Sequence, residues 1–202
     1  MKRVFIVHGW EGSPEEGWFP WLKRELESYG FAVTVPAMPD PANPLIDKWV
    51  SYLKSKTGQP NRDTFFVGHS IGCQTILRLI EKENSKIGKV VLVAPWIFLS
   101  DAAIEDQESK EIASPWLTIP INFEKIKENA TYTAIFSTND PYVPLDSNRR
   151  VFENRLGAEI IIEENKKHFS GKDGVDQLPS ALNAILEISK SSKWPNPNIP
   201  RN

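Results

Sequence analysis

Six short runs of apolar residues, rich in Val, Ile, Phe and Ala, recur along the chain. Within each run the apolar positions are continuous and do not alternate with polar ones. This pattern is typical of strands that are buried on both faces of a parallel sheet. We therefore predict strands over residues 3–8, 32–36, 64–68, 89–94, 131–137 and 158–163.

Between these runs, apolar residues recur every three or four positions, which is the spacing of a helix with one buried face. The helix that follows residue 70 would bury Cys73, Ile76, Leu77 and Ile80. Further helices are predicted over about residues 44–56, 147–156 and 179–190. Asn43 and Asp146 are the expected N-caps of the first two of these helices.

The first helix has two possible starts. It covers residues 14–29 with Ser13 as its N-cap, or it begins only at Pro20. The second start is considered because a proline inside a helix removes one backbone hydrogen bond. Gly30 is the expected stop in both cases.

Strands that alternate with helices indicate a parallel sheet covered on both faces. The predicted fold class is α/β, a three-layer α/β/α sandwich around a six-stranded parallel sheet. At 202 residues the chain forms a single domain, which we assign to residues 1–192. Residues 95–130 lack a clean period, and we expect them to form a small, partly helical cap or insertion. The proline-rich tail 193–202 is expected to be irregular.

The third predicted strand runs directly into Gly68-His69-Ser70-Ile71-Gly72, and a helical pattern follows. In a strand–turn–helix of this kind, the serine sits on a sharp, strained turn, and the small flanking residues let the backbones pass each other. The N–H groups at the start of the helix point toward the serine hydroxyl, which suits a developing negative charge. The sequence therefore predicts Ser70 as a nucleophile.

A serine hydroxyl needs a base to take its proton, and that base needs a carboxylate to hold its tautomer. His168 follows the last predicted strand, at the same edge of the sheet as Ser70. The acid is expected after the fifth strand, where Asp140 comes first and Asp146 is its rival. We favour Asp140, because Asp146 is the predicted cap of the next helix.

An oxyanion hole needs two backbone N–H groups that converge on the developing charge. Ile71, directly after the nucleophile, is expected to supply one of them. The other is expected from Trp10, because Gly9 before it allows a tight turn; Glu11 is the alternative donor. Candidate walls of an apolar pocket for the acyl group are Trp10, Trp96, Phe98, Trp116 and Phe169.

Composition excludes several other classes of function. A net charge of −2 with dispersed signs provides no electrostatic footprint for nucleic acid. No apolar run is long enough to span a membrane or to form the core of a signal peptide. One cysteine and three histidines give no metal-ligand pattern and no internal disulfide. We expect a cytoplasmic protein without nucleic-acid or membrane partners, and nothing in the sequence indicates a protein partner.

Taken together, the motifs resemble the α/β-hydrolases, and more narrowly the small YdeN-like serine hydrolases, the family that includes retinoblastoma-binding protein nine. The resemblance covers about residues 3–190. It rests on His8-Gly9, Trp18-Phe19-Pro20-Trp21-Leu22, Pro36-x-x-Pro39, Gly68-His69-Ser70-Ile71-Gly72, Asn139-Asp140-Pro141-Tyr142-Val143-Pro144, His168-Phe169 and Leu178-Pro179. The resemblance implies the strand order 2-1-3-4-5-6, a triad of Ser70, Asp140 and His168, and no cofactor.

We therefore predict a serine hydrolase that cleaves a small ester, thioester or amide through an acyl-Ser70 intermediate. Two alternatives stay open at this point. The first is a binding or scaffold protein that keeps the fold but has little or no turnover. The second is a cofactor-free acyltransferase or lyase that uses the same site.

Overall fold

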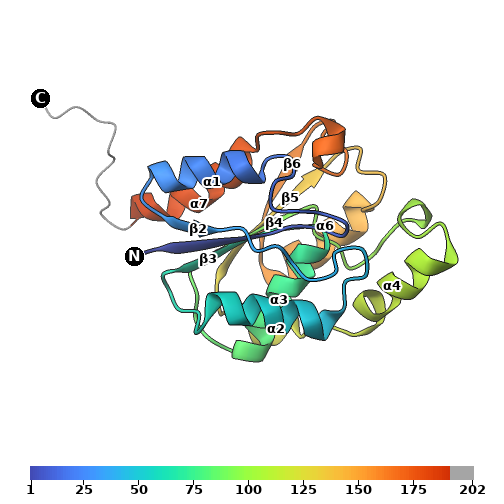
Figure 1. Cartoon of the computed structure of the whole chain (residues 1–202), viewed down its shortest axis with the longest axis horizontal. Helices are drawn as coiled ribbons and strands as arrows, with labels where there is room; N and C mark the ends of the chain where they lie inside the picture. The colour runs from blue at the N-terminus through green and yellow to red at the C-terminus, as the bar shows by residue number, and fades with distance from the viewer. Residues whose placement is uncertain (192–202) are drawn as a thin grey trace, which may run out of the picture.

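The structure of the protein, a computed structural model, describes residues 1–191 and contains an open sheet with helices on both faces (Figure 1). The strands are β1 Arg3–Val7, β2 Ala32–Thr34, β3 Thr64–His69, β4 Lys89–Val93, β5 Thr131–Ser137 and β6 Glu159–Glu163. The α-helices are α1 Phe19–Ser28, α2 Ile46–Thr57, α3 Ile71–Glu83, α4 Gln107–Thr118, α5 Phe123–Ile126, α6 Leu145–Leu156 and α7 Pro179–Ser191. The tail predicted over 193–202 lies outside the described residues.

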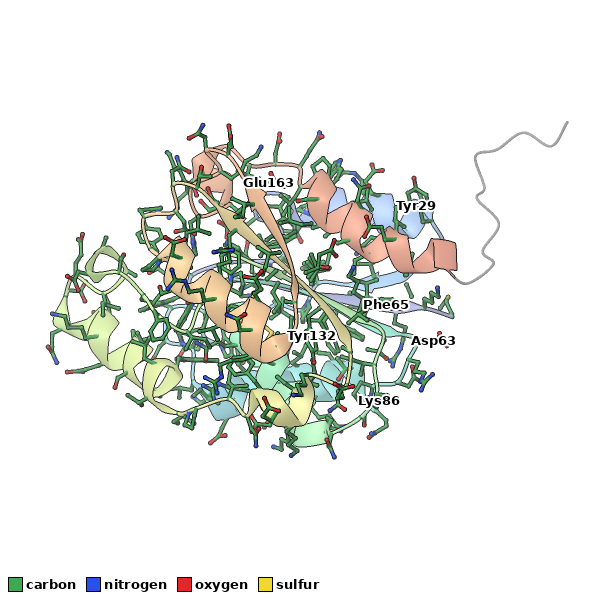
Figure 2. The ribbon with its side chains drawn as sticks, turned by 180° about the vertical axis from the view of Figure 1, so that it is seen from behind. Tyr29, Asp63, Phe65, Lys86, Tyr132 and Glu163 are labelled. Atoms are coloured by element: carbon green, nitrogen blue, oxygen red, sulfur yellow. The ribbon has the colours of Figure 1, made fainter. Side chains whose placement is uncertain are left out.

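All six strands are parallel, in the order β2-β1-β3-β4-β5-β6, so the predicted fold class and strand order are confirmed. Because β1 lies between β2 and β3, the chain leaves β1 and β3 toward opposite sides, which opens a crevice at their carboxyl ends. Figure 2 shows Asp63 and Lys86, which precede β3 and β4, at the amino-terminal edge of the sheet. Glu163 at the end of β6 lies away from them.

Two apolar layers enclose the sheet. α1 and α7 cover one face, and α2, α3 and α6 cover the other (Figure 1). Every residue of β3 and β4 is buried, which explains why their apolar runs are continuous. Within residues 1–191, no helix combines the length and the apolar character needed to cross a membrane.

Three helices do not begin at the N-cap residues first predicted for them. α1 starts at Phe19, so the later of its two predicted starts is the closer one, and Pro20 lies in its first turn. α2 starts after Leu45, without a side-chain cap from Asn43. α6 starts after Pro144, because the Pro144 carbonyl accepts hydrogen bonds from the Asn148 backbone (3.3 Å) and side chain (2.8 Å). Asp146 is therefore an exposed residue of the first turn of α6 and not its cap.

The long connection between β4 and β5 contains a 3-10 helix at Asp101–Ala103, followed by α4 and α5. α4 lies at the end of the molecule toward which the strands run (Figure 1). Its last turn is anchored to the body of the protein by two hydrogen bonds. Trp116 Nε1 donates to the Pro44 carbonyl at 2.9 Å, and Arg78 Nη2 donates to the Ile119 carbonyl at 2.7 Å. The C-terminal end of α4 therefore packs beside α2 and α3.

The two glycines around Ser70 are required by close backbone contacts. A Cβ atom at Gly72 would lie 2.5 Å from the Val7 carbonyl oxygen and 2.6 Å from that of His8. A Cβ atom at Gly68 would lie 2.9 Å from the backbone nitrogen of Cys73. The start of α3 thus rests directly on the end of β1, as expected for small residues that let the backbones pass.

Two buried histidines at the carboxyl ends of β1 and β3, His8 and His69, bind neighbouring loops. His8 Nε2 accepts from the Met38 N–H at 3.0 Å, so its Nδ1–H donates to the Gly9 carbonyl at 2.9 Å. His69 Nε2 is 2.7 Å from the His168 carbonyl oxygen, an acceptor, so this nitrogen carries the proton. Burial lowers the pKa of His8, and burial together with the nearby His168 lowers the pKa of His69 to about 3.

We expect Gly72→Ala to lower the free energy of unfolding by about 3 kcal/mol or more, because the added methyl group meets two backbone oxygens that cannot move independently. Denaturant unfolding would measure the loss. Gly157→Ala is the matched control: Gly157 has a φ of 70° and open space around its Cβ position, so the substitution should cost only about 1–2 kcal/mol of backbone strain. Equal losses for the two variants would contradict the close contact.

We expect the neutral His69 to make the protein less stable in acid. Between its unfolded-state pKa near 6.5 and its folded-state pKa near 3, the unfolded chain binds a proton that the folded chain does not, so stability falls as the pH is lowered through this range. In His69→Gln the amide nitrogen can replace Nε2 as donor but cannot titrate. Between pH ~7 and ~4.5 its free energy of unfolding should fall less than that of the wild type, by at least about 1 kcal/mol. Parallel pH profiles would contradict this assignment.

Candidate active site

Ser70 lies at the junction of β3 and α3 with a strained backbone. Its φ of 53° and ψ of −122° are rare for a residue other than glycine. Its N–H donates to the Val93 carbonyl at 2.9 Å, which holds the turn against the neighbouring strand β4. The residue is only 9% exposed, so a substrate would meet the hydroxyl in a confined space.

Asp140 and His168 are in direct contact. His168 Nδ1 is 2.8 Å from Asp140 Oδ2, and the two side chains are 14% and 3% exposed. The other carboxylate oxygen, Oδ1, accepts from the backbone N–H groups of Tyr142 at 2.9 Å and Val143 at 3.1 Å. A carboxylate only accepts, so in the neutral imidazole the proton lies on Nδ1, and Nε2 has no hydrogen-bond partner among residues 1–191.

The loop that carries His168 is strained. Asn165, Lys167 and Phe169 all have positive φ values, between 46° and 58°. Side chains at the end of β5 and just after it hold this loop: the Lys167 N–H donates to Asn139 Oδ1 at 2.8 Å, and the Lys166 N–H donates to Ser137 Oγ at 3.1 Å. The loops that carry the acid and the histidine are thereby tied together.

The backbone of His168 is bound on both sides. Its carbonyl accepts from His69 Nε2, and its N–H donates to Asp173 Oδ2 at 3.2 Å. The rings of His69 and His168 are 5.0 Å apart, and the ring of Tyr142 meets that of His168 edge-on at 5.2 Å. Because His69 immediately precedes Ser70, these contacts bring the His168 loop beside the serine turn. Among residues 1–191, however, the hydrogen-bond partner of Ser70 Oγ is Trp96 Nε1 at 3.3 Å and not His168.

The loop after β1 carries the two candidate oxyanion donors, the N–H groups of Trp10 and Glu11. The Glu11 N–H donates to the Pro41 carbonyl at 2.8 Å, so it is not available to a substrate. Within the described chain, the backbone N–H groups of Trp10 and of Ile71, the first residue of α3, have no acceptor. Of the two alternatives in this loop, Trp10 therefore has the available donor.

The five aromatic candidates for the acyl pocket lie in different environments. Trp96 contacts the Ser70 hydroxyl and is 2% exposed. Trp10 is half-buried and its Nε1 donates to the Ala42 carbonyl, whereas Phe98 is 48% exposed. Trp116 and Phe169 are buried in the two apolar layers, on opposite faces of the sheet.

Sequence reasoning did not identify the support given by His69, Asn139 and Asp173. Asp173 forms a capping box with Ser170, and its Oδ2 also accepts from the backbone of His168. The Ser-x-x-Asp spacing from Ser170 was the available signal for that cap. In residues 1–191, no group of three or more His, Cys, Asp or Glu side chains is arranged to hold a metal ion.

Comparison with known proteins finds relatives that cover most of the chain. YdeN of Bacillus subtilis is 26% identical over 195 residues, which cover 95% of this chain and 99% of that protein. Its crystal structure superposes with a TM-score of 0.82 and covers 96% of this chain and 100% of its own. Rat serine hydrolase RBBP9 is 28% identical over 159 residues, which cover 78% of this chain and 80% of that protein.

A more distant solved structure shares the fold alone. Est1E of Butyrivibrio proteoclasticus is 13% identical, with a TM-score of 0.73 over 95% of this chain and 89% of its own. The family described as serine hydrolase matches residues 4–187, which is most of the chain and includes β1 to β6 apart from Arg3. By this match the protein belongs to the serine hydrolase family.

Proposed function

We propose that the protein cleaves a small ester, thioester or amide through an acyl-Ser70 intermediate, with His168 as the base and Asp140 as its orienting acid. The observation that carries the proposal is the 2.8 Å hydrogen bond between His168 Nδ1 and Asp140 Oδ2. It leaves Nε2 of His168 free, in a loop that His69 ties to the strained turn of Ser70.

In the first step, Ser70 Oγ attacks the carbonyl carbon of the substrate, and its proton passes to His168 Nε2. Asp140 stabilises the resulting imidazolium, because its carboxylate already accepts the Nδ1–H. His168 then donates the proton to the leaving group as the tetrahedral intermediate collapses. In the second step a water molecule, activated by the same nitrogen, releases the acid and restores Ser70.

The negative charge on the carbonyl oxygen needs two donors, and we assign the N–H groups of Trp10 and Ile71 to this role. Both lack an acceptor within the described chain. The Ile71 N–H also lies at the positive end of α3, where the helix dipole favours an anion. His8 supports the loop of the first donor, because it bridges the Gly9 carbonyl and the Met38 N–H.

The family and the site support the proposed substrate class. Est1E, which shares the fold, has been solved with ferulic acid bound, and that ligand is a carboxylic acid of the kind an ester hydrolase releases. Exposed Phe98 and half-buried Trp10 flank the loops after β4 and β1 and offer apolar surface to an acyl group. We therefore favour small carboxylic esters over larger substrates. We also propose that the reaction takes place in the cytoplasm.

We expect Ser70→Ala and His168→Ala each to lower kcat by at least about 10³-fold on p-nitrophenyl esters, because each removes a group that acts in the bond-making step. A panel of p-nitrophenyl esters of increasing chain length and aminoacyl amides would measure the loss and define the preferred acyl group. A fluorophosphonate probe should label the wild type and not Ser70→Ala. Equal labelling of both would refute the nucleophile.

Asp140→Asn should lower kcat by about 10⁴-fold, because an amide in place of the carboxylate favours the wrong tautomer of His168. Asp146→Asn is the matched control: it lies six residues away, is exposed, and should keep most of the activity. Steady-state kinetics on the best ester would compare the two. Loss of activity in Asp146→Asn with Asp140→Asn intact would reverse the assignment of the acid.

A further inference from the structure

The Ser70 hydroxyl has a partner that the proposed triad does not use. The indole Nε1–H of Trp96 donates to Ser70 Oγ at 3.3 Å. Trp96 is 2% exposed, and Ser70 is 9% exposed, so water competes little for this contact. Trp96 follows the end of β4, one strand away from the serine turn.

A side chain of α3, the helix that follows Ser70, holds Trp96 in place. The Trp96 carbonyl accepts from Gln74 Nε2 at 3.1 Å, and Gln74 is a fully buried residue one turn after Ser70 on α3. Gln74 Oε1 accepts from Arg78 Nη2 at 3.0 Å, which fixes the direction of the amide. A change in the position of α3 would therefore carry Ser70 and Trp96 together.

A second anchor fixes the segment after Trp96. The buried Asn148 of α6 accepts from the N–H groups of Ile97 at 2.7 Å and Phe98 at 3.0 Å through its Oδ1. Its Nδ2 donates to the Phe98 carbonyl at 2.9 Å. Two buried amide side chains thus bind the Trp96 carbonyl and the backbone of the two residues that follow it. This support is expected of a preorganised hydrogen-bond donor.

We propose that Trp96 is a catalytic hydrogen-bond donor to the nucleophilic oxygen, in both the acylation and the deacylation of Ser70. This inference rests on the proposed function, since it needs Ser70 as the nucleophile. An indole N–H only donates and does not take up a proton, so it cannot replace His168 as the base. By occupying a lone pair of Oγ, it leaves the serine O–H to point toward another acceptor, and His168 Nε2 is the base in the adjacent loop.

The two steps balance without a proton on Trp96. In acylation the Oγ–H proton goes to His168 Nε2 as the Oγ–C bond forms, and the carbonyl electrons move to the oxygen. They then return, the bond to the leaving group breaks, and the leaving group takes the proton from His168. In deacylation water adds to the acyl carbon and gives a proton to His168, the C–Oγ bond breaks to release the acid, and Oγ recovers that proton. Oγ carries the most negative charge while its bond forms or breaks, so a donor to Oγ stabilises both transition states more than the ground states.

The test is Trp96→Phe, which keeps an aromatic ring and removes the N–H. We expect kcat for p-nitrophenyl acetate to fall on the order of 10- to 100-fold, the effect of losing one hydrogen bond to a charged atom, with KM nearly unchanged. The rate of fluorophosphonate labelling should fall similarly. Trp49→Phe is the matched control, because it removes another buried indole donor, whose acceptor is the Pro39 carbonyl. It should retain kcat within about threefold.

The outcomes separate this inference from the proposed function. If Ser70→Ala is inactive and Trp96→Phe has wild-type kcat, the donor role is wrong and the nucleophile stands. A change confined to KM that grows with acyl-chain length would make Trp96 a pocket wall only, and faster labelling of Trp96→Phe would show that the indole restrains the serine. Full activity of Ser70→Ala would instead overturn the proposed function.

A measurement that does not depend on turnover tests the hydrogen bond even if Trp96→Phe is destabilised. In protein labelled with ¹⁵N-tryptophan, the indole resonance that disappears in Trp96→Phe identifies Trp96 Nε1–H. In Ser70→Ala this resonance should shift more than any other indole, and its N–H should exchange with deuterium faster, because its acceptor is gone. An unchanged shift and exchange rate would overturn the proposal.

Discussion

The structure depends on the contact between the start of α3 and the end of β1. Gly72 leaves no room for a side chain beside the Val7 and His8 carbonyls, so the helix begins directly above the carboxyl end of the central strands. This contact brings the first N–H of α3, the serine turn and the loop after β1 to one place. The strand order favours this contact as well, because β1 and β3 are neighbours at the point where the strand order reverses.

The second requirement is polar support for loops that are strained. Residues with left-handed backbone conformations flank His168. Such a strained backbone persists only where surrounding contacts hold it in place. The donors and acceptors come from β3, from the end of β5 and from the 3-10 helix at Gly171–Asp173. The site is therefore built from loops, but each loop is bound to a neighbouring element and not left to solvent.

Most of the fold was predictable because the apolar runs of β3, β4 and β5 are continuous and their burial is nearly complete. Helix starts were less predictable. Asp146 looked like a cap by residue type, but Asn148 binds the Pro144 carbonyl from inside the helix and sets an earlier start. For α1, Pro20 was the informative residue, since a proline fits the first turn of a helix.

The residues proposed as catalytic could also be predicted from local motifs, whereas the residues that hold their loops in place could not. The bond from His69 to the His168 carbonyl spans 99 residues, and that from Trp18 to the Phe169 carbonyl spans 151. No spacing along the chain encodes such pairs. Phe169, one of the candidate pocket walls, has a fully buried ring that packs with α1 and α7.

The pair of imidazoles has a consequence for charge during turnover. With ring centres 5.0 Å apart, two positive rings would repel each other, and the buried His69 already disfavours a charge. Its Nε2–H is bound to a carbonyl, so its other ring nitrogen would have to accept the proton in a buried position. In the proposed mechanism, a proton taken up by His168 therefore does not pass to the neighbouring ring of His69, and the leaving group and Ser70 Oγ remain its destinations.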